Sequence, residues 1–536
     1  MIDNKHSSNF FFMAVVLLFL LTRLVHLTII PIFNDEAIYI SWAKIINEDL
    51  HDIWLPIKAD NSKPLFLWLI AIFLNFFENP LRAARFVSVL AGFFSLIGIY
   101  FIGQKLHSKW VGCLSALFYT VCPYYLFYDR MAHKDSLLNC LFIWLLFLTL
   151  EMLKINEKHR GRYYLAMGFT IGLSLLTKGT AILFVMLPLI LIFIFFKKNT
   201  LALWKALMLT YLPGFLIGSF PYAFLFLTSS DFSVKNIFIP SGNSMGQASI
   251  TDILYRIPTN LYHGAGGTIS YFTTYLTIPV ILLAAAFFIF QFKFIKNKTN
   301  VVLIFYFLIP YFLLLGVAGR GFSRHYLFCG TPILLWAAMA LNYSVDHIKK
   351  RIPRSFLYLT IAPIAIIALY PAFFFDIKLL TEPEDVSFVG RDYDQYISNE
   401  FSGYGIPEAL NYFKKVSTNK KIEVFTTPNW GNPADSVHIY LSDSPNSSVY
   451  TTHWVFEQNL LPAGASKIII KKMYQKYTGK NFGELLINSD SYVYFICSSS
   501  EFEQYIFLKK NKNFQLVRSF RKPNSTVSID IYKRIS

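Results

Sequence analysis

Long apolar runs constrain the fold of this 536-residue chain more than any other feature. The first run, residues 10–30, has the roughly 20 residues that a helix needs to cross the hydrocarbon core of a bilayer. Similar runs recur over the first 375 residues, and hydrophobic residues make up 54% of the sequence. Soluble globular domains do not have this composition. We therefore predict a polytopic α-helical membrane protein.

The apolar runs also predict a topology. With the N-terminus in the cytosol, the Lys and Arg clusters between the runs all fall on the cytosolic side, as the positive-inside rule requires. Counting residues 64–77 as a span would place every later cluster outside, so this stretch is predicted to lie at the surface or to re-enter. The candidate spans are residues 10–30, 82–101, 110–124, 136–153, 163–176, 181–196, 206–227, 271–290, 301–317, 326–343 and 355–374.

The composition changes after residue 375. Residues 376–536 are polar, with a helix start at residues 407–410 and short β-type runs at residues 422–426, 467–471, 492–497 and 527–532. We predict a membrane domain over residues 1–375 and an extracytoplasmic α/β domain over residues 376–536.

Charge and cysteine content exclude other classes. The net charge of +17 comes mainly from the clusters between apolar runs, so it indicates orientation rather than nucleic-acid binding. The five cysteines have neither metal-ligand spacing nor a disulfide pattern, and no metal or cofactor is predicted. The polar N-terminus leads into a full-length apolar run without a small-residue cleavage site, which indicates an uncleaved anchor.

Two adjacent acids, Asp35 and Glu36, follow the first apolar run. Ionisable groups at a membrane are costly unless they are solvated or have a function. Asn34 is a good N-cap, so both acids could instead be first-turn residues that interact with the helix dipole, above all Glu36. The helix is predicted to lie in the membrane plane, with Trp42 on one face and Ser41 on another.

Further charged residues are expected on the same membrane face. Carboxylates there could accept a proton from a hydroxyl group, and Lys or Arg could hold phosphate oxygens. Structural interpretations stay open: Asp135 could cap a helix, Lys63 could snorkel, and Arg130 could form an interfacial salt bridge. Lys178, Arg320 and Arg324 could only anchor headgroups, His263 and His325 could be hydrogen-bonded interface residues, and Tyr124, Tyr125 and Tyr128 are interpreted as an interfacial aromatic belt.

Five short segments occur in an order that resembles a known family. They are DEAIY at residues 35–39, KPLFLW at 63–68, DRMAHKD at 129–135, LTKG at 176–179 and RHYL at 324–327. Over residues 9–343 the chain resembles the lipid-linked-sugar transferases of the GT-C class, in particular the protein mannosyltransferases and the aminoarabinose transferases of lipid A. Leu65 stands where the family often has a second proline, and the Trp-Trp-Asp signature of oligosaccharyltransferases is absent.

The resemblance implies a GT-C fold and an enzyme that transfers one sugar, with inversion, from a polyprenyl-phosphate donor. The acceptor would be a lipid, glycan or protein on the outer face, and neither a nucleotide sugar nor a metal would be needed. Asp35 would be the catalytic carboxylate, Lys63 a donor-phosphate ligand and Asp135 a second acid in the acceptor or sugar pocket. The other residues predicted to contact substrate are Glu36, Arg130, Lys178, Arg256, Arg324 and His325.

The long outer loop at residues 228–270 is predicted to be a mobile cover, with Gly264, Gly266 and Gly267 as flexible points and Arg256 reaching the donor phosphate. A bacterial inner membrane is the expected location.

Two other functions are open. The alternative is a transporter or flippase of lipid-linked sugars, which should carry charge near mid-membrane and show repeated halves. A third hypothesis is an envelope assembly protein without catalysis, in which Asp35 could be replaced by Asn.

Overall fold

The computed structural model describes residues 5–60, 62–196, 200–228, 250–290, 297–349, 354–427, 429–450, 492–501, 509 and 514–535. Its contacts divide the chain into two compact units. The first unit comprises Met1–His26, Asn61–Phe66 and Arg85–Val389, and the second comprises Leu27–Asp60, Leu67–Ala84 and Gly390–Ser536. This division differs from the predicted boundary at residue 375, because most of the first outer segment groups with the C-terminal part of the chain.

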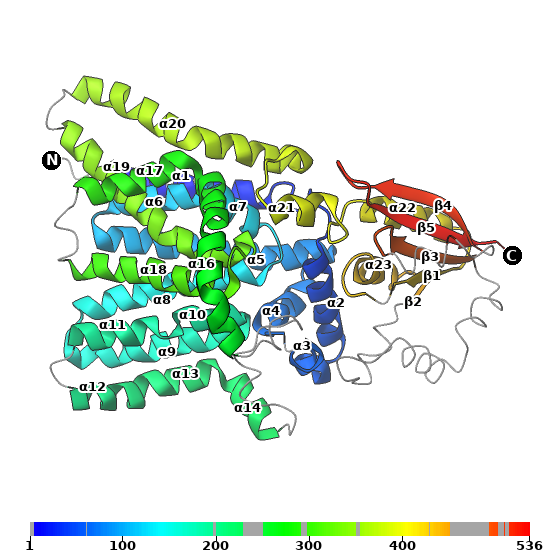
Figure 1. The fold of residues 1–536 in the computed structure, drawn as a ribbon, viewed down its shortest axis with the longest axis horizontal. Helices are drawn as coiled ribbons and strands as arrows, with labels where there is room; N and C mark the ends of the chain where they lie inside the picture. Colours follow the sequence, from blue (N-terminus) through cyan, green and yellow to red (C-terminus); the bar gives the residue numbers. More distant parts are fainter. Residues whose placement is uncertain are drawn as a thin grey trace. The chain divides into compact units, whose positions relative to one another are not determined.

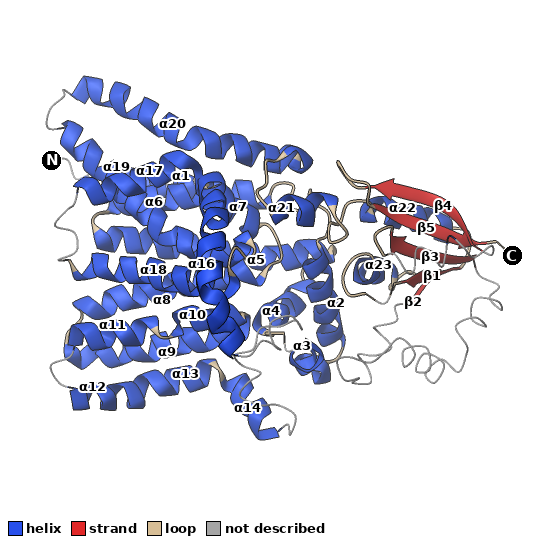
Figure 2. Ribbon diagram, viewed as in Figure 1, coloured by secondary structure: helices blue, strands red, loops and turns tan. Residues whose placement is uncertain are grey.

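The first unit is helical, whereas all the described strands belong to the second (Figures 1 and 2). Its principal helices are α1 (Lys5–Leu24), α5 (Pro80–Leu106, whose first turn belongs to the second unit), α6 (Lys109–Val121), α7 (Pro123–Asp129), α8 (Lys134–Lys154), α9 (Arg160–Thr177), α10 (Ile182–Val185), α11 (Leu187–Phe196), α12 (Thr200–Ala206), α13 (Leu212–Gly218), α14 (Phe220–Thr228), α16 (Ile250–Phe272), α17 (Ile278–Phe290), α18 (Lys298–Ala318), η8 (Ser323–Cys329), α19 (Gly330–Lys349) and α20 (Arg354–Thr381).

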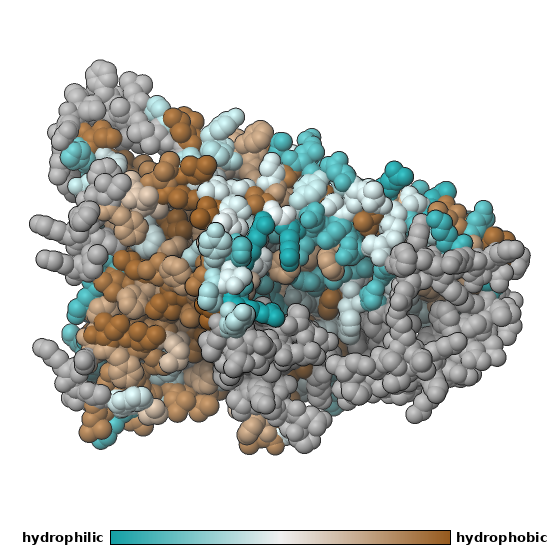
Figure 3. Space-filling model, viewed as in Figure 1, coloured by the Kyte–Doolittle hydropathy of each residue, from teal (hydrophilic) through white to brown (hydrophobic). Residues whose placement is uncertain are grey.

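The length and apolar surface of these helices confirm the predicted polytopic membrane fold. In the described ranges, seven helices are long and apolar enough to cross a membrane, or up to nine if each of two bent pairs is one span. The bends are 64° between α6 and α7 and 72° between α13 and α14. Figure 3 shows apolar side chains over the helices of this unit. Two further predicted spans, residues 163–176 and 355–374, lie in α9 and α20.

The stretch at residues 64–77 forms the short helix α4 (Leu65–Leu74) of 10 residues. At 1.5 Å of rise per residue, such a helix is about half as long as the hydrocarbon core is thick. It therefore does not cross the membrane by itself, which agrees with the prediction.

The second unit contains a five-stranded sheet with the order β2-β1-β3-β5-β4. The strands are β1 (Ile422–Thr426), β2 (Ser447–Tyr450), β3 (Tyr492–Ser498), β4 (Phe514–Arg521) and β5 (Ser528–Arg534). β1 pairs in parallel with β2 and β3, and β5 is antiparallel to β3 and β4. β3 is central and almost continuously apolar because both of its faces are buried. The strands predicted at residues 422–426, 492–497 and 527–532 are confirmed within a residue or two, and the strand predicted at 467–471 lies outside the described residues.

The helices of the second unit include α2 (Asn34–Glu48), α22 (Ile406–Ser417) and α23 (Ala434–Leu441). α2 begins where predicted, but the assignment of its faces was wrong. Ser41 is buried together with Trp42, because α23 packs against α2 and the Trp42 ring lies 5.3 Å from that of Trp430. The helix is thus packed within a folded unit.

The prediction of a mobile glycine-containing cover was also wrong for the described part of that loop. Residues 250–270 lie in the 23-residue helix α16, and residues 229–249 are outside the described ranges. A Cβ at Gly264 would lie 2.7 Å from the backbone carbon of Gly319. Gly264 therefore permits close helix contact and is not a hinge.

Candidate active site

The predicted catalytic acid, Asp35, lies in the first turn of α2 in the second unit. Its neighbour Glu36 is fully buried, and the Phe33 backbone N–H donates to Glu36 Oε2 at 2.9 Å. Glu36 thus satisfies a backbone donor at the helix start, as a capping glutamate does. This geometry favours the structural interpretation of Glu36 over substrate contact, whereas the side chain of Asp35 is partly exposed.

The first unit contains a group of cationic residues that starts at Lys63. The Lys63 side chain is 2% exposed, and burial lowers its pKa to about 8. The preceding residue, Ser62, accepts a hydrogen bond of 2.5 Å from Lys134 Nζ. Lys63 and Lys134, separated by 71 positions in the chain, are therefore brought into one neighbourhood, and ammonium groups are suited to binding phosphate oxygens.

Asp135 and Lys178 form an ion pair in this unit, with 2.6 Å between Asp135 Oδ1 and Lys178 Nζ. Asp135 lies in the first turn of α8, and Lys178 is the extended residue that follows α9. The Asp135 side chain is 5% exposed and that of Lys178 is 19% exposed. A nearly buried carboxylate is thus paired with one ammonium group that still reaches solvent.

Arg324 and His325 come to the same region from η8. The Tyr128 hydroxyl lies 2.6 Å from Ser323 Oγ, and Ser136 Oγ donates to the Tyr128 carbonyl at 2.7 Å. These bonds connect η8 to α7 and to the start of α8. Burial, and after it the positive charges of Arg324, Lys178 and Arg85, hold the pKa of His133 well below its usual value. The region is therefore electropositive, as a phosphate site requires.

The interpretation of the tyrosines as an interfacial belt was wrong. Tyr124, Tyr125 and Tyr128 are all fully buried. The Tyr124 hydroxyl donates to the Ser323 carbonyl and the Tyr125 hydroxyl donates to the Leu327 carbonyl, so both hold η8 in place. In the sequence, a tyrosine that binds a buried carbonyl cannot be distinguished from one that faces headgroups.

Arg130 is occupied by backbone groups. Its guanidinium donates to four carbonyl oxygens, those of Thr22, Arg23, Val25 and His26, at 2.7 to 3.1 Å. These carbonyls lie at the C-terminal end of α1, where a cation also complements the helix dipole. The geometry therefore favours an anchoring role for Arg130 instead of the predicted substrate contact.

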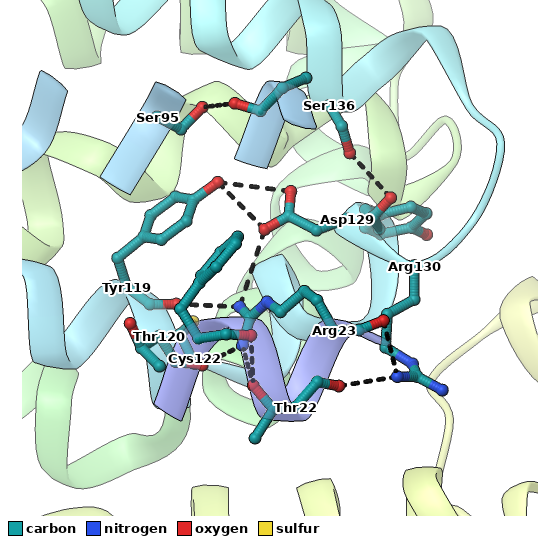
Figure 4. Close-up of polar contacts among 12 residues, drawn as sticks. Thr22, Arg23, Ser95, Tyr119, Thr120, Cys122, Asp129, Arg130 and Ser136 are labelled. Atoms are coloured by element: carbon teal, nitrogen blue, oxygen red, sulfur yellow. Dashed lines mark hydrogen bonds and ion pairs between the residues drawn. The ribbon is translucent and has the colours of Figure 1, made fainter. Parts of the chain in front are cut away.

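A fully buried ion pair, which the sequence analysis missed, lies beside this anchor (Figure 4). Arg23 Nη2 is 3.7 Å from Asp129 Oδ2, and both side chains have no exposed surface. The Tyr119 hydroxyl donates to the same carboxylate at 3.2 Å. Together with Arg130, this pair fixes the end of α7, and the turn from that end leads to Asp135. The arginine inside the first apolar run was the available signal.

The remaining predicted residues differ in position. Arg256 is exposed on α16, and the Arg320 guanidinium lies 5.5 Å from the centre of the Tyr271 ring. Among the described residues, no group of three or more His, Cys, Asp or Glu side chains could hold a metal ion.

Comparison with known proteins gives a family match over part of the chain and a shared fold. Residues 60–223 match the family described as dolichyl-phosphate-mannose-protein mannosyltransferase. No curated protein sequence matches the chain.

Solved structures share the fold at low identity. ArnT from Cupriavidus metallidurans, bound to undecaprenyl phosphate, aligns with a TM-score of 0.62 at 11% identity over 100% of this chain and 99% of that one. The oligosaccharyltransferase of Archaeoglobus fulgidus in its apo form gives 0.55 at 12% identity over 94% and 71%. The archaeal oligosaccharyltransferase AglB, from the same organism, in complex with an inhibitory peptide and a dolichol-phosphate, gives 0.54 at 12% identity over 92% and 70%.

The fold and the family match define the class of protein: a multi-pass membrane glycosyltransferase with the GT-C fold. Within that class, the chain is similar to the protein mannosyltransferases and to ArnT, which confirms the predicted resemblance.

Proposed function

We propose that this protein transfers a single sugar, with inversion, from a polyprenyl-phosphate donor to a lipid, glycan or protein acceptor on the outer face of a bacterial inner membrane. The observation that carries the proposal is the buried cation Lys63, with Lys134 and the Asp135–Lys178 pair, inside the matched residues 60–223. Ammonium groups form charge-assisted hydrogen bonds with phosphate oxygens, and a lipid phosphate would supply such oxygens. ArnT bound to undecaprenyl phosphate and AglB in complex with a dolichol-phosphate, which share the fold, support the donor class.

In this proposal each charged group has one task. Asp35 takes the proton from the acceptor hydroxyl as its oxygen attacks the anomeric carbon of the donor sugar. The bond between that carbon and the phosphate oxygen breaks, and the polyprenyl phosphate leaves with the electron pair. Lys63 stabilises the negative charge that grows on the phosphate.

Asp135 orients the sugar or the acceptor, and Lys178 holds the Asp135 carboxylate in place through their ion pair. Arg324 adds positive potential beside His133, and His325 and Arg256 are candidate contacts for the donor. Glu36 and Arg130 act by holding α2 and the end of α7, and not by touching substrate.

The test is sugar transfer from a panel of radiolabelled polyprenyl-phosphate sugars in liposomes, comparing the wild type with Asp35→Asn at matched folding. Loss of a general base lowers the rate by about 10²–10⁴-fold, with donor binding retained. Full turnover by Asp35→Asn would refute its role as the base. Protein-dependent movement of intact donor across the bilayer, without transfer to any acceptor, would instead support the flippase.

A further inference from the structure

The chain segment that leads into α2 is held by residues from the far end of the sequence, within the second unit. Asn432 Nδ2 donates to the Ile32 carbonyl at 2.9 Å and to the Phe401 carbonyl at 3.1 Å. The Asn432 backbone N–H donates to Asn34 Oδ1 at 2.8 Å, and the Asn34 N–H donates to the Phe401 carbonyl at 3.0 Å. Asn432 is 5% exposed, so these bonds form away from water. Asn432 thus holds both Asn34, which directly precedes Asp35, and Ile32. It is 398 positions from the first and 400 from the second in the chain.

The packing at this contact leaves room only for glycine at two positions. A Cβ at Gly431 would lie 2.0 Å from Asn34 Oδ1, and Gly431 has φ +89°. A Cβ at Gly403 would lie 2.1 Å from the Ile32 carbonyl oxygen. The Gly431 N–H in turn donates to the fully buried carboxylate of Asp435 at 2.5 Å. The Gly431–Asn432 turn is therefore locked on one side by α23 and touches the start of α2 on the other.

A second buried side chain, that of Lys522, holds the segment at residues 400–402. Lys522 Nζ donates to the Ser402 carbonyl at 2.5 Å and to the Glu400 carbonyl at 3.4 Å, and the side chain is 2% exposed. Phe401 lies between Glu400 and Ser402 in the chain. Its carbonyl accepts hydrogen bonds from both Asn34 and Asn432. Two segments, those of Phe401 and Asn432, thus bond to the residue next to Asp35, and Lys522 holds the first of them.

We propose that Asn432 is a positioning residue for the catalytic carboxylate of Asp35, so that the C-terminal part of the chain takes part in the transfer reaction. The inference rests on the proposed function. Asn432 touches Asn34, and Asp35 is the next residue in the first turn of α2. A displacement of a reacting group by about 1 Å can cost about 10²-fold in rate.

The experiment compares Asn432→Asp with the matched control Asn446→Ala in the full-length protein. Asn446 Nδ2 donates to the Ser417 carbonyl at 2.9 Å, so the control removes a similar side-chain bond in the same unit, away from α2. Asn432→Asp keeps the size of the side chain but places oxygen atoms against two carbonyls. We expect kcat to fall at least tenfold with an unchanged donor KM, while Asn446→Ala keeps the wild-type kcat at a similar melting temperature.

A cycle with Asp35→Asn separates positioning from general destabilisation. If Asn432 acts through Asp35, adding Asn432→Asp to Asp35→Asn lowers the residual turnover no further. Two independent, multiplying losses, or a wild-type kcat in Asn432→Asp, would overturn the inference. If Asn432→Asp does not fold, Asn34→Ala removes the Oδ1 acceptor of the Asn432 N–H and is expected to show the same kcat loss and the same lack of additivity.

Failure of the proposed function gives a different result. In that case either the wild type itself transfers no sugar or Asp35→Asn keeps its turnover, and Asn432 has no catalytic group to position. If Asp35→Asn loses turnover but Asn432→Asp and Asn34→Ala do not, only the inference about Asn432 is wrong.

Discussion

Donor binding should depend on pH through Lys63. Burial lowers the pKa of this ammonium to about 8, so the charge is present below that pH and is lost as the pH rises through it. About 90% of the side chain is charged at pH 7 and about 10% at pH 9. If only the charged form holds the donor phosphate, donor affinity falls by roughly tenfold over this interval. A lysine with an ordinary pKa near 10.4 would give almost no change.

The substitution Lys63→Met should lower the affinity for the donor and remove the pH dependence of that affinity. A hydrogen bond to a charged group contributes about 1.5–3 kcal/mol, which corresponds to a loss of roughly 10–150-fold in affinity. The control is Lys44→Met, since Lys44 forms an ion pair of 2.8 Å with the exposed Asp443 in the second unit. This control should keep the wild-type affinity and pH profile.

The assay is equilibrium binding of a non-transferable polyprenyl phosphodiester in detergent between pH 6 and 10. A diester is needed because its single charge stays constant over this range, so any change in affinity comes from the protein. An affinity that is flat from pH 7 to 9 in the wild type, or a slope that persists in Lys63→Met, would show that Lys63 does not hold the phosphate.

Two further predictions concern stability. Gly92→Ala places a Cβ 2.5 Å from the Asp129 carboxyl group and should lower the free energy of unfolding by about 1–3 kcal/mol. The control is Gly266→Ala, which should not destabilise because a Cβ at Gly266 meets nothing within 4 Å. Thermal unfolding of both variants in detergent checks this, and equal melting temperatures would contradict it. Burial lowers the pKa of Lys522 to about 7 in the folded protein, so between this pH and the ordinary lysine pKa the unfolded chain binds one proton more than the folded one. The free energy of unfolding should therefore rise by about 3 kcal/mol from pH 6.5 to 9.5, relative to Lys522→Met. Urea denaturation at the two pH values measures this difference, and the same pH dependence of stability in both proteins would refute it.

The class of fold could be predicted because hydropathy is a local property. A run of apolar residues specifies a helix of a given length wherever the rest of the chain goes, and short β-type runs marked three of the described strands. The curvature of the spans was less predictable. The runs at residues 110–124 and 206–227 each appear continuous in the sequence, yet they bend by 64° and 72°. A proline stands in the first turn after each break, Pro123 in α7 and Pro221 in α14.

The contacts of the site could be predicted only in part, because they join distant positions. Residues of the expected types do meet in the first unit, as the Asp135–Lys178 pair shows. However, the sequence did not indicate that Arg130 would donate to the end of α1, or that Asp129 would pair with Arg23. A charged residue in a sequence specifies a need for a partner but not which partner, and backbone carbonyls at a helix end satisfy an arginine as well as a phosphate does.

The pair Asp35-Glu36 shows how the structure assigns roles that the sequence left open. Consecutive residues on a helix point about 100° apart, since a turn has 3.6 residues. Two adjacent acids in a first turn therefore cannot share one environment. Glu36 turns inward and binds the Phe33 N–H, and Asp35 is left partly exposed. Because the capping requirement is met by Glu36, the carboxylate of Asp35 is not needed for that task, and this division of roles makes Asp35→Asn a test of chemistry and not of helix formation.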